Sequence, residues 1–271
     1  MISFPNCKIN LGLHIIGKRP DGYHDLETVF YPIPLKDALE LVESTETSIK
    51  ITGLSVPGNN EDNLCLKAYR LLKNDFPHLP PVQVHLHKAI PTGAGLGGGS
   101  ADGAFMLMLL DKKFELKLTQ TQLIAYALQL GSDCPFFIIN KPVFATGRGE
   151  NMSSTDVDLS GFTFVIVNPQ IHISTKESFA RLTPKMPVKN IKSVLQQPIN
   201  TWKDELVNDF EIGLFQSFIE IKEVKMALYN SGALYASMTG TGSTVFGIFD
   251  RKTNINLSFP NHYLYLQLPA A

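Results

Sequence analysis

A run of glycines after a short apolar strand pattern offers the clearest chemistry in this sequence. The segment PTGAGLGGGSADGA, Pro91 to Ala104, places five glycines within the seven residues from Gly93 to Gly99. Glycine lets the backbone approach a phosphate closely and turn successive N–H groups toward it. The N-terminus of the helix expected after the loop adds a partial positive charge. We therefore expect the loop to bind a di- or triphosphate, and a flexible linker is the weaker interpretation.

The commonest phosphate and dinucleotide loops differ from this one. Gly93 to Gly98 fit GxGxxG, but the segment about 20 residues further on, LDKKFELKLTQTQ, is not an apolar strand ending in an acid. No Gly-Lys-Ser/Thr follows, which excludes a Walker A loop, and the VAIK, HRD and DFG elements of protein kinases are missing. A nicotinamide-dependent oxidoreductase stays as a minor alternative, which NADH binding would support.

The loop resembles, nearly letter for letter, the PxGxGLGGGSAD signature of the GHMP kinases. One branch of that family is similar in three further stretches, KINLGLHIIGKRPDGYH (Lys8 to His24), LGSDCPFF (Leu130 to Phe137) and MTGTGSTVFGIF (Met238 to Phe249). The resemblance implies an α+β, two-domain GHMP kinase fold with the active site in the cleft between the domains. It also implies ATP-dependent phosphorylation of the 2-hydroxyl of a cytidine diphosphate-linked methylerythritol, in isoprenoid precursor synthesis without mevalonate. Another small alcohol as acceptor, or a catalytically silent nucleotide-binding protein, stays as an alternative.

The resemblance also assigns the catalytic pair. It implies that Asp133 is the base and Lys8 its cationic partner, since a lysine beside an aspartate keeps it ionised and able to accept a proton. By residue type alone, Asp133 could cap the next turn and Lys8 could be an exposed strand residue. Their occurrence together with the glycine loop favours catalysis.

The implied ligand contacts fall into two groups. ATP is the expected co-substrate and brings Mg²⁺, which the Ser100 hydroxyl could reach. The residues implied for ATP are Lys88, Pro91, Thr92, Gly93, Ala94, Gly95, Leu96, Gly97, Gly98, Gly99, Ser100 and Ala101. Lys88 has an equal alternative as a solvated strand end.

For the second substrate, the resemblance implies that Tyr23 and Phe179 stack on the cytosine ring while His24 hydrogen-bonds its polar edge. Asn10 and Thr175 are implied near the erythritol and its phosphates. Gly240 and Gly242 are implied to shape the substrate site. The alternatives are core packing for Phe179 and a plain hairpin for the glycine turn.

Composition limits the other ligands and partners. Lys plus Arg, 24, nearly balance Asp plus Glu, 25, so no strong field favours nucleic acid or a membrane surface. His85 and His87 share a strand face, yet no cysteine or carboxylate cluster joins them, and we expect no protein-bound metal. The widely spaced cysteines, Cys7, Cys65 and Cys134, indicate free thiols. We expect a cytoplasmic monomer or weak dimer whose partner is a small-molecule substrate.

The elements expected around the loop mix strands and helices, which favours the α+β class. Alternating residues from Cys7 to Ile15 predict a strand with one apolar and one polar face, and RPDGYH then turns it into a hairpin with Leu26 to Ile33. Val82 to Leu86 predicts the strand before the loop, and Ala101 to Leu110 the helix after it. Within that helix, Gly103 replaces the family's usual alanine, which should loosen the first turn by up to about 1 kcal/mol.

Further along the chain, Thr119 with Gln122 predicts a capping box for a helix that ends near Gly131. The polar stretch Gly147 to Ser160 is the candidate domain junction. We place the domains at 1–152 and 153–271. The second half should hold a strand at Phe162 to Val167, helices up to Asn230, and a final pair of strands around the glycine turn.

Overall fold

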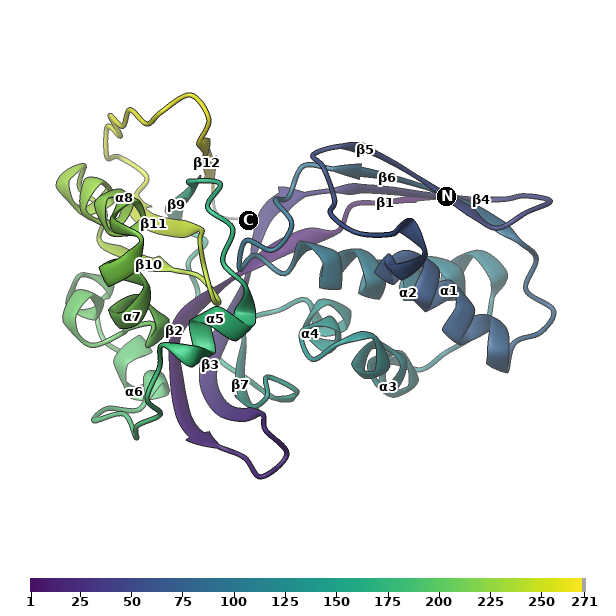
Figure 1. Cartoon of the computed structure of the whole chain (residues 1–271), viewed down its shortest axis with the longest axis horizontal. Helices are drawn as coiled ribbons and strands as arrows, with labels where there is room; N and C mark the ends of the chain where they lie inside the picture. Colours follow the sequence, from purple (N-terminus) through teal and green to yellow (C-terminus); the bar gives the residue numbers. More distant parts are fainter. Residues whose placement is uncertain (270–271) are drawn as a thin grey trace. The chain divides into compact units, whose positions relative to one another are not determined.

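The computed structural model of the protein describes residues 1–269 and mixes helices and strands along the chain (Figure 1). The strands are β1 (Ile2–Ser3), β2 (Asn6–Lys18), β3 (His24–Lys36), β4 (Ala38–Glu43), β5 (Ser48–Gly53), β6 (Val82–Lys88), β7 (Val143–Gly147), β8 (Asn151–Ser154), β9 (Phe162–Asn168), β10 (Tyr235–Met238), β11 (Val245–Asp250) and β12 (Leu264–Pro269). The α-helices are α1 (Leu64–Asp75), α2 (Gly98–Phe114), α3 (Gln120–Leu130), α4 (Cys134–Ile139), α5 (Thr175–Ala180), α6 (Ile191–Leu195), α7 (Phe210–Ser217) and α8 (Ile219–Asn230), and two short 3-10 helices are η1 (Asn60–Asp62) and η2 (Ile199–Asp204). The mixture confirms the α+β class.

The chain divides into two compact units, each built from separate segments. The first unit contains Met1–Cys7, Leu35–Thr92 and Gly97–Lys141. The second contains Lys8–Pro34, Gly93–Leu96 and the chain from Pro142 on. The glycine loop therefore contributes residues to both units. A boundary between residues 152 and 153 stays a prediction.

The first unit is a sheet covered on one face by helices. Its strands run in the order β1-β4-β6-β5, with β5 parallel to β6 and the other pairs antiparallel. Helices α1 and α2 lie side by side along one face of this sheet (Figure 1). Alternate residues of β6, Val82, Val84 and Leu86, are fully buried, as their period of two predicts. This arrangement places the glycine loop directly between a sheet strand and the N-terminus of α2.

Gly103 has a packing role in α2. The helix runs through it without interruption. A Cβ at this position would lie 3.0 Å from Leu64 Cβ and 3.4 Å from Leu130 Cδ1. The residue that the sequence marked as a weak point of the helix thus allows α1 and α3 to pack closely against α2.

The long hairpin of β2 and β3 belongs to a second sheet, in the order β2-β3-β7-β8. The turn between its strands lies at residues 20–22, as the RPDG sequence predicts. The polar face of β2 is buried as well as the apolar one, since Lys8, Asn10 and His14 are at most 5% exposed. The predicted polar face is therefore not a solvent-exposed one, because other segments of the chain cover it.

The third sheet, β10-β11-β9-β12, is antiparallel throughout and forms the core of the second unit. Helices α7 and α8 lie against it, and α8 contacts β10 and β11 (Figure 1). Apolar residues on both layers, including Val165, Val224 and Phe249, are at most 2% exposed. This core supports the turn between β10 and β11.

Several short elements were not predicted, β8 and α6 among them. The expected junction from Gly147 to Ser160 contains β8, which pairs with β7. The stretch from Thr183 to Pro198, rich in proline and lysine, contains α6, whose N-cap is the Asn190 side chain. Both elements are short and lack the long apolar periodicity on which sequence interpretation depends.

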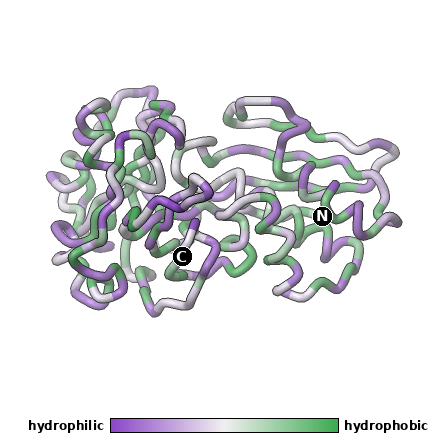
Figure 2. The backbone as a smooth tube through the Cα atoms, turned by 60° about the horizontal axis from the view of Figure 1, so that its bottom comes forward, coloured by the Kyte–Doolittle hydropathy of each residue, from purple (hydrophilic) through white to green (hydrophobic). Residues whose placement is uncertain are grey.

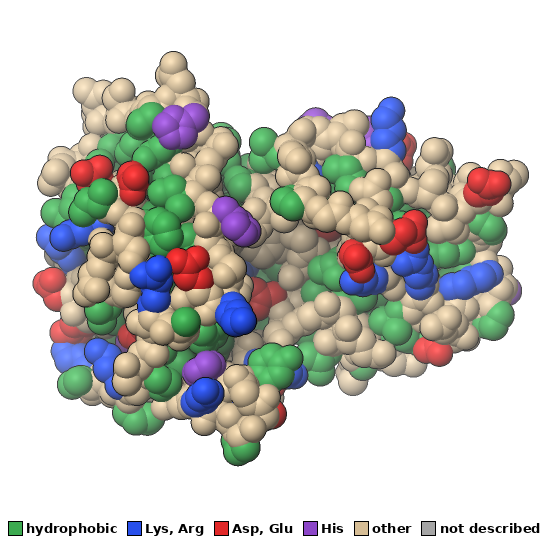
Figure 3. Space-filling view, viewed as in Figure 1, with side chains coloured by type: hydrophobic (Ala, Val, Ile, Leu, Met, Phe, Trp, Pro, Cys, Tyr) green, Lys and Arg blue, Asp and Glu red, His purple; other side chains and the backbone are tan. Residues whose placement is uncertain are grey.

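The chain carries no long apolar run. Short hydrophobic and hydrophilic stretches alternate along the backbone (Figure 2), and none of the helices within residues 1–269 is long and apolar enough to cross a membrane. On the face shown in Figure 3, basic and acidic side chains are interspersed, in keeping with the balanced charge.

The capping box of α3 gives a test of local stability. The Thr119 hydroxyl accepts a hydrogen bond from Gln122 N at 3.3 Å, and Gln122 Oε1 accepts one from Thr119 N at 2.9 Å. Thr119→Ala should lower the free energy of unfolding by about 1 kcal/mol, since it leaves the Gln122 N–H without its acceptor. Thr121→Ala, an exposed change inside the same helix, is the control and should stay within about 0.5 kcal/mol in denaturant melts. Equal losses in both variants would contradict the capping role.

Candidate active site

The glycine loop joins β6 to α2, so the predicted order of strand, loop and helix is confirmed. Gly93, Gly95 and Gly97 have φ values of +67°, +79° and +70°, in the left-handed region that glycine adopts without strain. Gly97 is the N-cap of α2 and supplies no side-chain acceptor to its first turn. The N–H groups at this helix start are thus available to an anion.

The loop residues that are predicted to bind ATP differ in their exposure to solvent. Thr92, Gly93 and Gly99 are exposed. Ala94, Leu96, Gly98 and Ala101 are buried, and Pro91, Gly95, Gly97 and Ser100 are intermediate. These four buried residues have apolar side chains or, at Gly98, none, so any phosphate contact they make must come from their backbone.

Gly95 fixes the loop against the turn between β10 and β11. A Cβ at position 95 would lie 2.0 Å from the Thr239 carbonyl oxygen, and a Cβ at Gly240 would lie 3.0 Å from Gly95 Cα. The two backbones therefore meet where a side chain on either glycine would collide. Strands β10 and β11 do form a plain antiparallel hairpin, but its turn also supports the loop.

Lys8 lies at the same place, with its side chain buried. Its ammonium donates hydrogen bonds to Asn10 Oδ1 at 2.7 Å and to the Gly95 carbonyl at 3.2 Å, and it lies 5.0 Å from the centre of the Phe30 ring. Its backbone N donates to the Leu96 carbonyl at 3.0 Å. Because Lys8 is only 4% exposed, the alternative of an exposed strand lysine was wrong.

Asn10 connects this lysine to the turn. Its Oδ1 also accepts from Gly240 N at 3.0 Å and from the Thr239 hydroxyl at 3.1 Å, while its Nδ2 donates to the Thr28 hydroxyl at 2.9 Å. Asn10 is 2% exposed and these contacts use both ends of its amide. Direct contact between Asn10 and a substrate stays a prediction.

Two residues that sequence reasoning missed hold the other side of the turn. Asn208 Nδ2 donates to the Met238 and Gly240 carbonyls, at 2.8 and 2.9 Å. Glu211 Oε1 accepts from Met238 N at 2.8 Å, and its Oε2 pairs with Lys225 at 2.6 Å. The signal was present in LVNDFE, because amide and acidic residues set among apolar ones at a helix start indicate buried polar groups.

Asp133 stands at the N-cap position of α4 and is partly exposed. The helix receives no capping hydrogen bond from its side chain, which removes the support for a purely capping role. The next residue, Cys134, has a thiol pKa raised to about 12 by burial, while a hydrogen bond with Ser100 opposes the shift and the Asp133 charge adds to it. The Cys134 thiol is therefore neutral and unreactive at physiological pH.

Two of the cytidine candidates follow the turn of the β2–β3 hairpin in the second unit. His24 stacks on Phe179 with ring centroids 4.6 Å apart, and Phe179 packs edge-on against Phe210 at 4.9 Å. Tyr23 is 55% exposed, with the Arg148 guanidinium 4.8 Å from its ring centre. Thr175 is exposed at the start of α5. The structure thus unites His24 with Phe179, while Tyr23 pairs with Arg148.

Lys88 is the most buried of the predicted ligand residues that carry a charge. It is 2% exposed, and its ammonium donates to Asp102 Oδ2 at 2.7 Å and to Asp37 Oδ2. The alternative of a solvated strand end was therefore wrong. Direct contact between Lys88 and a nucleotide stays a prediction.

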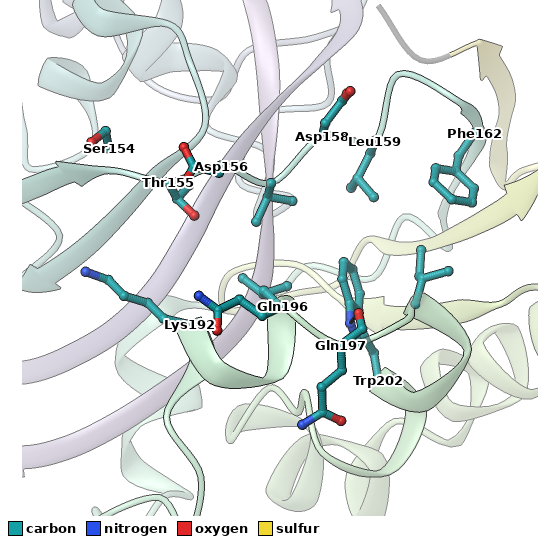
Figure 4. Close-up of a pocket in the computed structure, with 13 residues that line it drawn as sticks. Ser154, Thr155, Asp156, Asp158, Leu159, Phe162, Lys192, Gln196, Gln197 and Trp202 are labelled. Atoms are coloured by element: carbon teal, nitrogen blue, oxygen red, sulfur yellow. Dashed lines mark hydrogen bonds between the residues drawn. The ribbon is translucent and has the colours of Figure 1, made fainter.

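Other features lie away from these residues. His85 Nε2 and His87 Nδ1 both contact the Thr52 hydroxyl, at 2.9 and 3.0 Å. No group of three or more His, Cys, Asp or Glu side chains suited to a metal occurs within residues 1–269. A cavity of about 510 Å³ separates the segment 154–159 from α6 and η2 (Figure 4), and none of the predicted site residues lines it.

Comparison with known proteins places this geometry in a family. The chain matches the GHMP kinases N terminal domain over residues 63–141 and the GHMP kinases C terminal domain over residues 191–257. It is 52% identical to a 4-diphosphocytidyl-2-C-methyl-D-erythritol kinase of Bacteroides thetaiotaomicron, with 92% of each chain covered. The protein of the same name from Cytophaga hutchinsonii is 50% identical, with 93% of each chain covered.

Solved structures agree in fold. A crystal structure of 4-(cytidine 5'-diphospho)-2C-methyl-D-erythritol kinase matches with a TM-score of 0.80 and 30% identity, over 92% of this chain and 90% of that one. The mevalonate kinase of Methanococcus jannaschii matches with a TM-score of 0.68 at 12% identity, over 100% of this chain and 98% of that one. The second match shows the fold alone.

The close contact at Gly95 predicts that alanine substitution changes the stability of the protein very differently at Gly95 and at Gly99. Gly95→Ala adds a methyl group 2.0 Å from the Thr239 carbonyl oxygen at a φ of +79°, and should lower the free energy of unfolding by about 2 to 5 kcal/mol. Gly99→Ala meets nothing within 4 Å inside a helix, and should be neutral or stabilising by up to about 1 kcal/mol. Urea melts of both variants make the comparison, and equal stabilities would contradict the described loop.

The protonation of Asp102 predicts a pH dependence of stability. Burial raises its pKa from 3.8 to about 7, against the opposing effect of Lys88, and Asp37 adds to the rise. Between pH 3.8 and about pH 7, Asp102 therefore holds a proton in the folded protein that it releases in the unfolded chain. This stabilisation is complete below the unfolded pKa and is lost as the pH rises through about 7.

We expect the free energy of unfolding to contain a component that falls by on the order of 1 kcal/mol per pH unit across this window. Asp102→Asn should remove that component. Glu115→Gln, at the exposed far end of the same helix, should retain it. Denaturant melts between pH 4 and pH 8 measure the slopes, and an unchanged slope in Asp102→Asn would contradict the assignment.

Proposed function

The chain belongs to the GHMP kinase family, whose members transfer a phosphoryl group from ATP, and on that premise we propose that it phosphorylates the 2-hydroxyl of 4-diphosphocytidyl-2-C-methyl-D-erythritol. The observation that carries the proposal is the identity of about half of all residues, over more than nine-tenths of both chains, with relatives named for that substrate. The reaction gives the 2-phosphate and ADP.

We propose that Lys8 stabilises charge on the transferred phosphoryl group. Its ammonium is buried and lies 3.2 Å from the Gly95 carbonyl, so its charge is held against the glycine loop. Charges held in place in this way contribute most when water is excluded, because the protein does not reorganise as negative charge develops. The loop backbone from Gly93 to Ala101 would bind the phosphates.

We propose that Asp133 is the base that accepts the proton of the attacking hydroxyl. Asp133 is partly exposed at the start of α4, and a carboxylate at this position can orient a hydroxyl for attack. Mg²⁺ would enter as part of the MgATP substrate. Ser100, at the start of α2, would reach that ion through its hydroxyl.

We propose that the cytosine is recognised beside the His24–Phe179 stack, with Tyr23 closing over it from the hairpin tip. The pKa of His24 is lowered, mainly by burial and also by the charge of Lys18, which favours the neutral imidazole. A neutral imidazole has one donor and one acceptor nitrogen, and can therefore pair with the amide-like edge of cytosine. Asn10, Thr175, Gly240 and Gly242 would shape the part of the site that holds the sugar alcohol.

An assay of ADP release, with purified protein, MgATP and one alcohol at a time, tests the substrate. The panel is 4-diphosphocytidyl-2-C-methyl-D-erythritol, mevalonate, homoserine and galactose. Turnover with the cytidyl substrate alone is the expected result. Turnover with another alcohol instead would overturn the substrate assignment, and ATP binding without any turnover would indicate a silent nucleotide-binding protein.

Replacing the proposed base separates chemistry from binding. Asp133→Asn should lower kcat by at least about 100-fold, because a positioned base contributes roughly that much or more. Its affinity for MgATP, measured by calorimetry, should stay within about threefold, since no binding role is assigned to the carboxylate. Asp156→Asn, which removes an exposed carboxylate, is the matched control. A fully active Asp133→Asn protein would eliminate Asp133 as the base.

Removing the exposed ring of Tyr23 tests stacking on cytosine. Tyr23→Ala should raise the KM for the cytidyl substrate by about tenfold, as expected for the loss of one base stacking contact. The KM for ATP should change little, and Tyr23→Phe should behave like the natural protein. Phe4→Ala removes an equally exposed ring, 56% against 55%, and should change neither KM. Equal effects of Tyr23→Ala on both substrates would argue against stacking.

A further inference from the structure

A buried cluster of three charged residues lies at the base of the glycine loop. Lys88 ends β6, Asp37 lies between β3 and β4, and Asp102 belongs to the first turns of α2. Their exposed fractions are 2%, 1% and 3%. Two carboxylates therefore share one ammonium in the interior of the first unit, an arrangement that costs desolvation energy and is seldom justified by stability alone.

The cluster contacts the chain on both sides of the loop. Before the loop, Asp37 Oδ1 accepts hydrogen bonds from Ala89 N at 2.6 Å and from Ile90 N at 2.8 Å. These two residues directly precede Pro91, where the loop begins. The entry to the loop is thus held by a buried carboxylate.

After the loop, the same cluster holds the start of α2. Lys88 Nζ donates to Asp102 Oδ2 at 2.7 Å. A Cβ at Gly98, the first residue of α2, would lie 3.4 Å from Lys88 Nζ and 2.7 Å from Ile90 Cγ2. The ammonium therefore lies directly beneath the helix start, and both ends of the loop depend on one network.

We propose that Asp37, Lys88 and Asp102 are positioning residues for nucleotide binding, which fix the two ends of the glycine loop so that its N–H groups converge on the phosphates of ATP. The proposal rests on the proposed function, in which this loop binds ATP. Lys88 would thus promote ATP binding by fixing the loop, without contacting the nucleotide itself. It also explains why a lysine next to a phosphate loop is held between two carboxylates.

Asp102 depends on Lys88 for its printed contact in the cluster. Its Oδ1 is buried and has no hydrogen-bond partner within residues 1–269. The charged side chains that face Asp102 are Lys88 from β6 and Asp37 from the β3–β4 connection. An amide in place of the Asp102 carboxyl group would therefore weaken the bond by which Lys88 holds the start of α2.

The first experiment uses Asp37→Asn, because a side chain that is only 1% exposed lies beneath the loop and does not itself meet the phosphates. The variant keeps an acceptor for Ala89 and Ile90 but replaces the oxygen facing Lys88 with an amide donor. Calorimetry should show MgATP binding at least tenfold weaker, with unchanged affinity for the cytidyl substrate. Binding of MgATP within twofold of the natural protein would overturn the proposal.

The second experiment uses Asp102→Asn, so that the proposal is tested even if Asp37→Asn fails to fold. Calorimetry should show MgATP binding at least tenfold weaker than that of the natural protein, because Lys88 loses a carboxylate acceptor at the start of α2. Glu115→Gln should bind MgATP like the natural protein. An Asp102→Asn protein that binds MgATP within twofold of the natural protein would overturn the role of Asp102.

These measurements distinguish the positioning role from the kinase assignment. A natural protein that binds no MgATP at all would refute the proposed function, whatever the variants do. A natural protein that binds MgATP, with variants that bind it equally well, would refute the positioning role alone.

Discussion

The close approach of two backbones, at Gly95 and Thr239, is the constraint on which the rest of the candidate site depends. A single methyl group at position 95 would lie 2.0 Å from the Thr239 carbonyl oxygen, so the loop and the turn meet only because side chains are absent there. Asn10 links the turn to Lys8, and Asn208 holds the turn from its other side. Residues from three separate parts of the second unit thus fix one short stretch of loop backbone, on which the proposed phosphate binding would depend.

Buried polar groups carry most of this arrangement. Asn10, Lys8 and Glu211 are each at most 6% exposed, and the contacts described for each bind it to backbone groups of the loop or the turn. Such groups are costly to bury unless they are hydrogen-bonded, so the network is stable as a whole and weak when one member is removed. The Asp37–Lys88–Asp102 cluster applies the same principle to the two ends of the loop in the first unit. Both sets of buried polar groups thus hold the glycine loop.

Local signals allowed much of the fold to be predicted from the sequence. The hairpin of β2 and β3, the strand–loop–helix order and the capping box of Thr119 all depend on residues close together in the chain, and all were confirmed. The burial of Lys8 and Lys88 could not be predicted, because it depends on segments far away in the sequence. For the same reason the sequence did not reveal Asn208, whose partners lie 30 and 32 residues further on. The strongly specific glycine motif led to the family, while the contacts that position it required the structure.

Hydrogen–deuterium exchange of the glycine loop tests the central claim most directly, because the claim concerns the backbone N–H groups of one segment. Exchange of residues 93–101 would be compared with and without MgATP, or a non-hydrolysable analogue, in the natural protein. We predict slower exchange in this segment when nucleotide is present, with the strongest protection at the start of α2. Nucleotide binding that calorimetry detects, but that leaves exchange in residues 93–101 unchanged, would contradict the account.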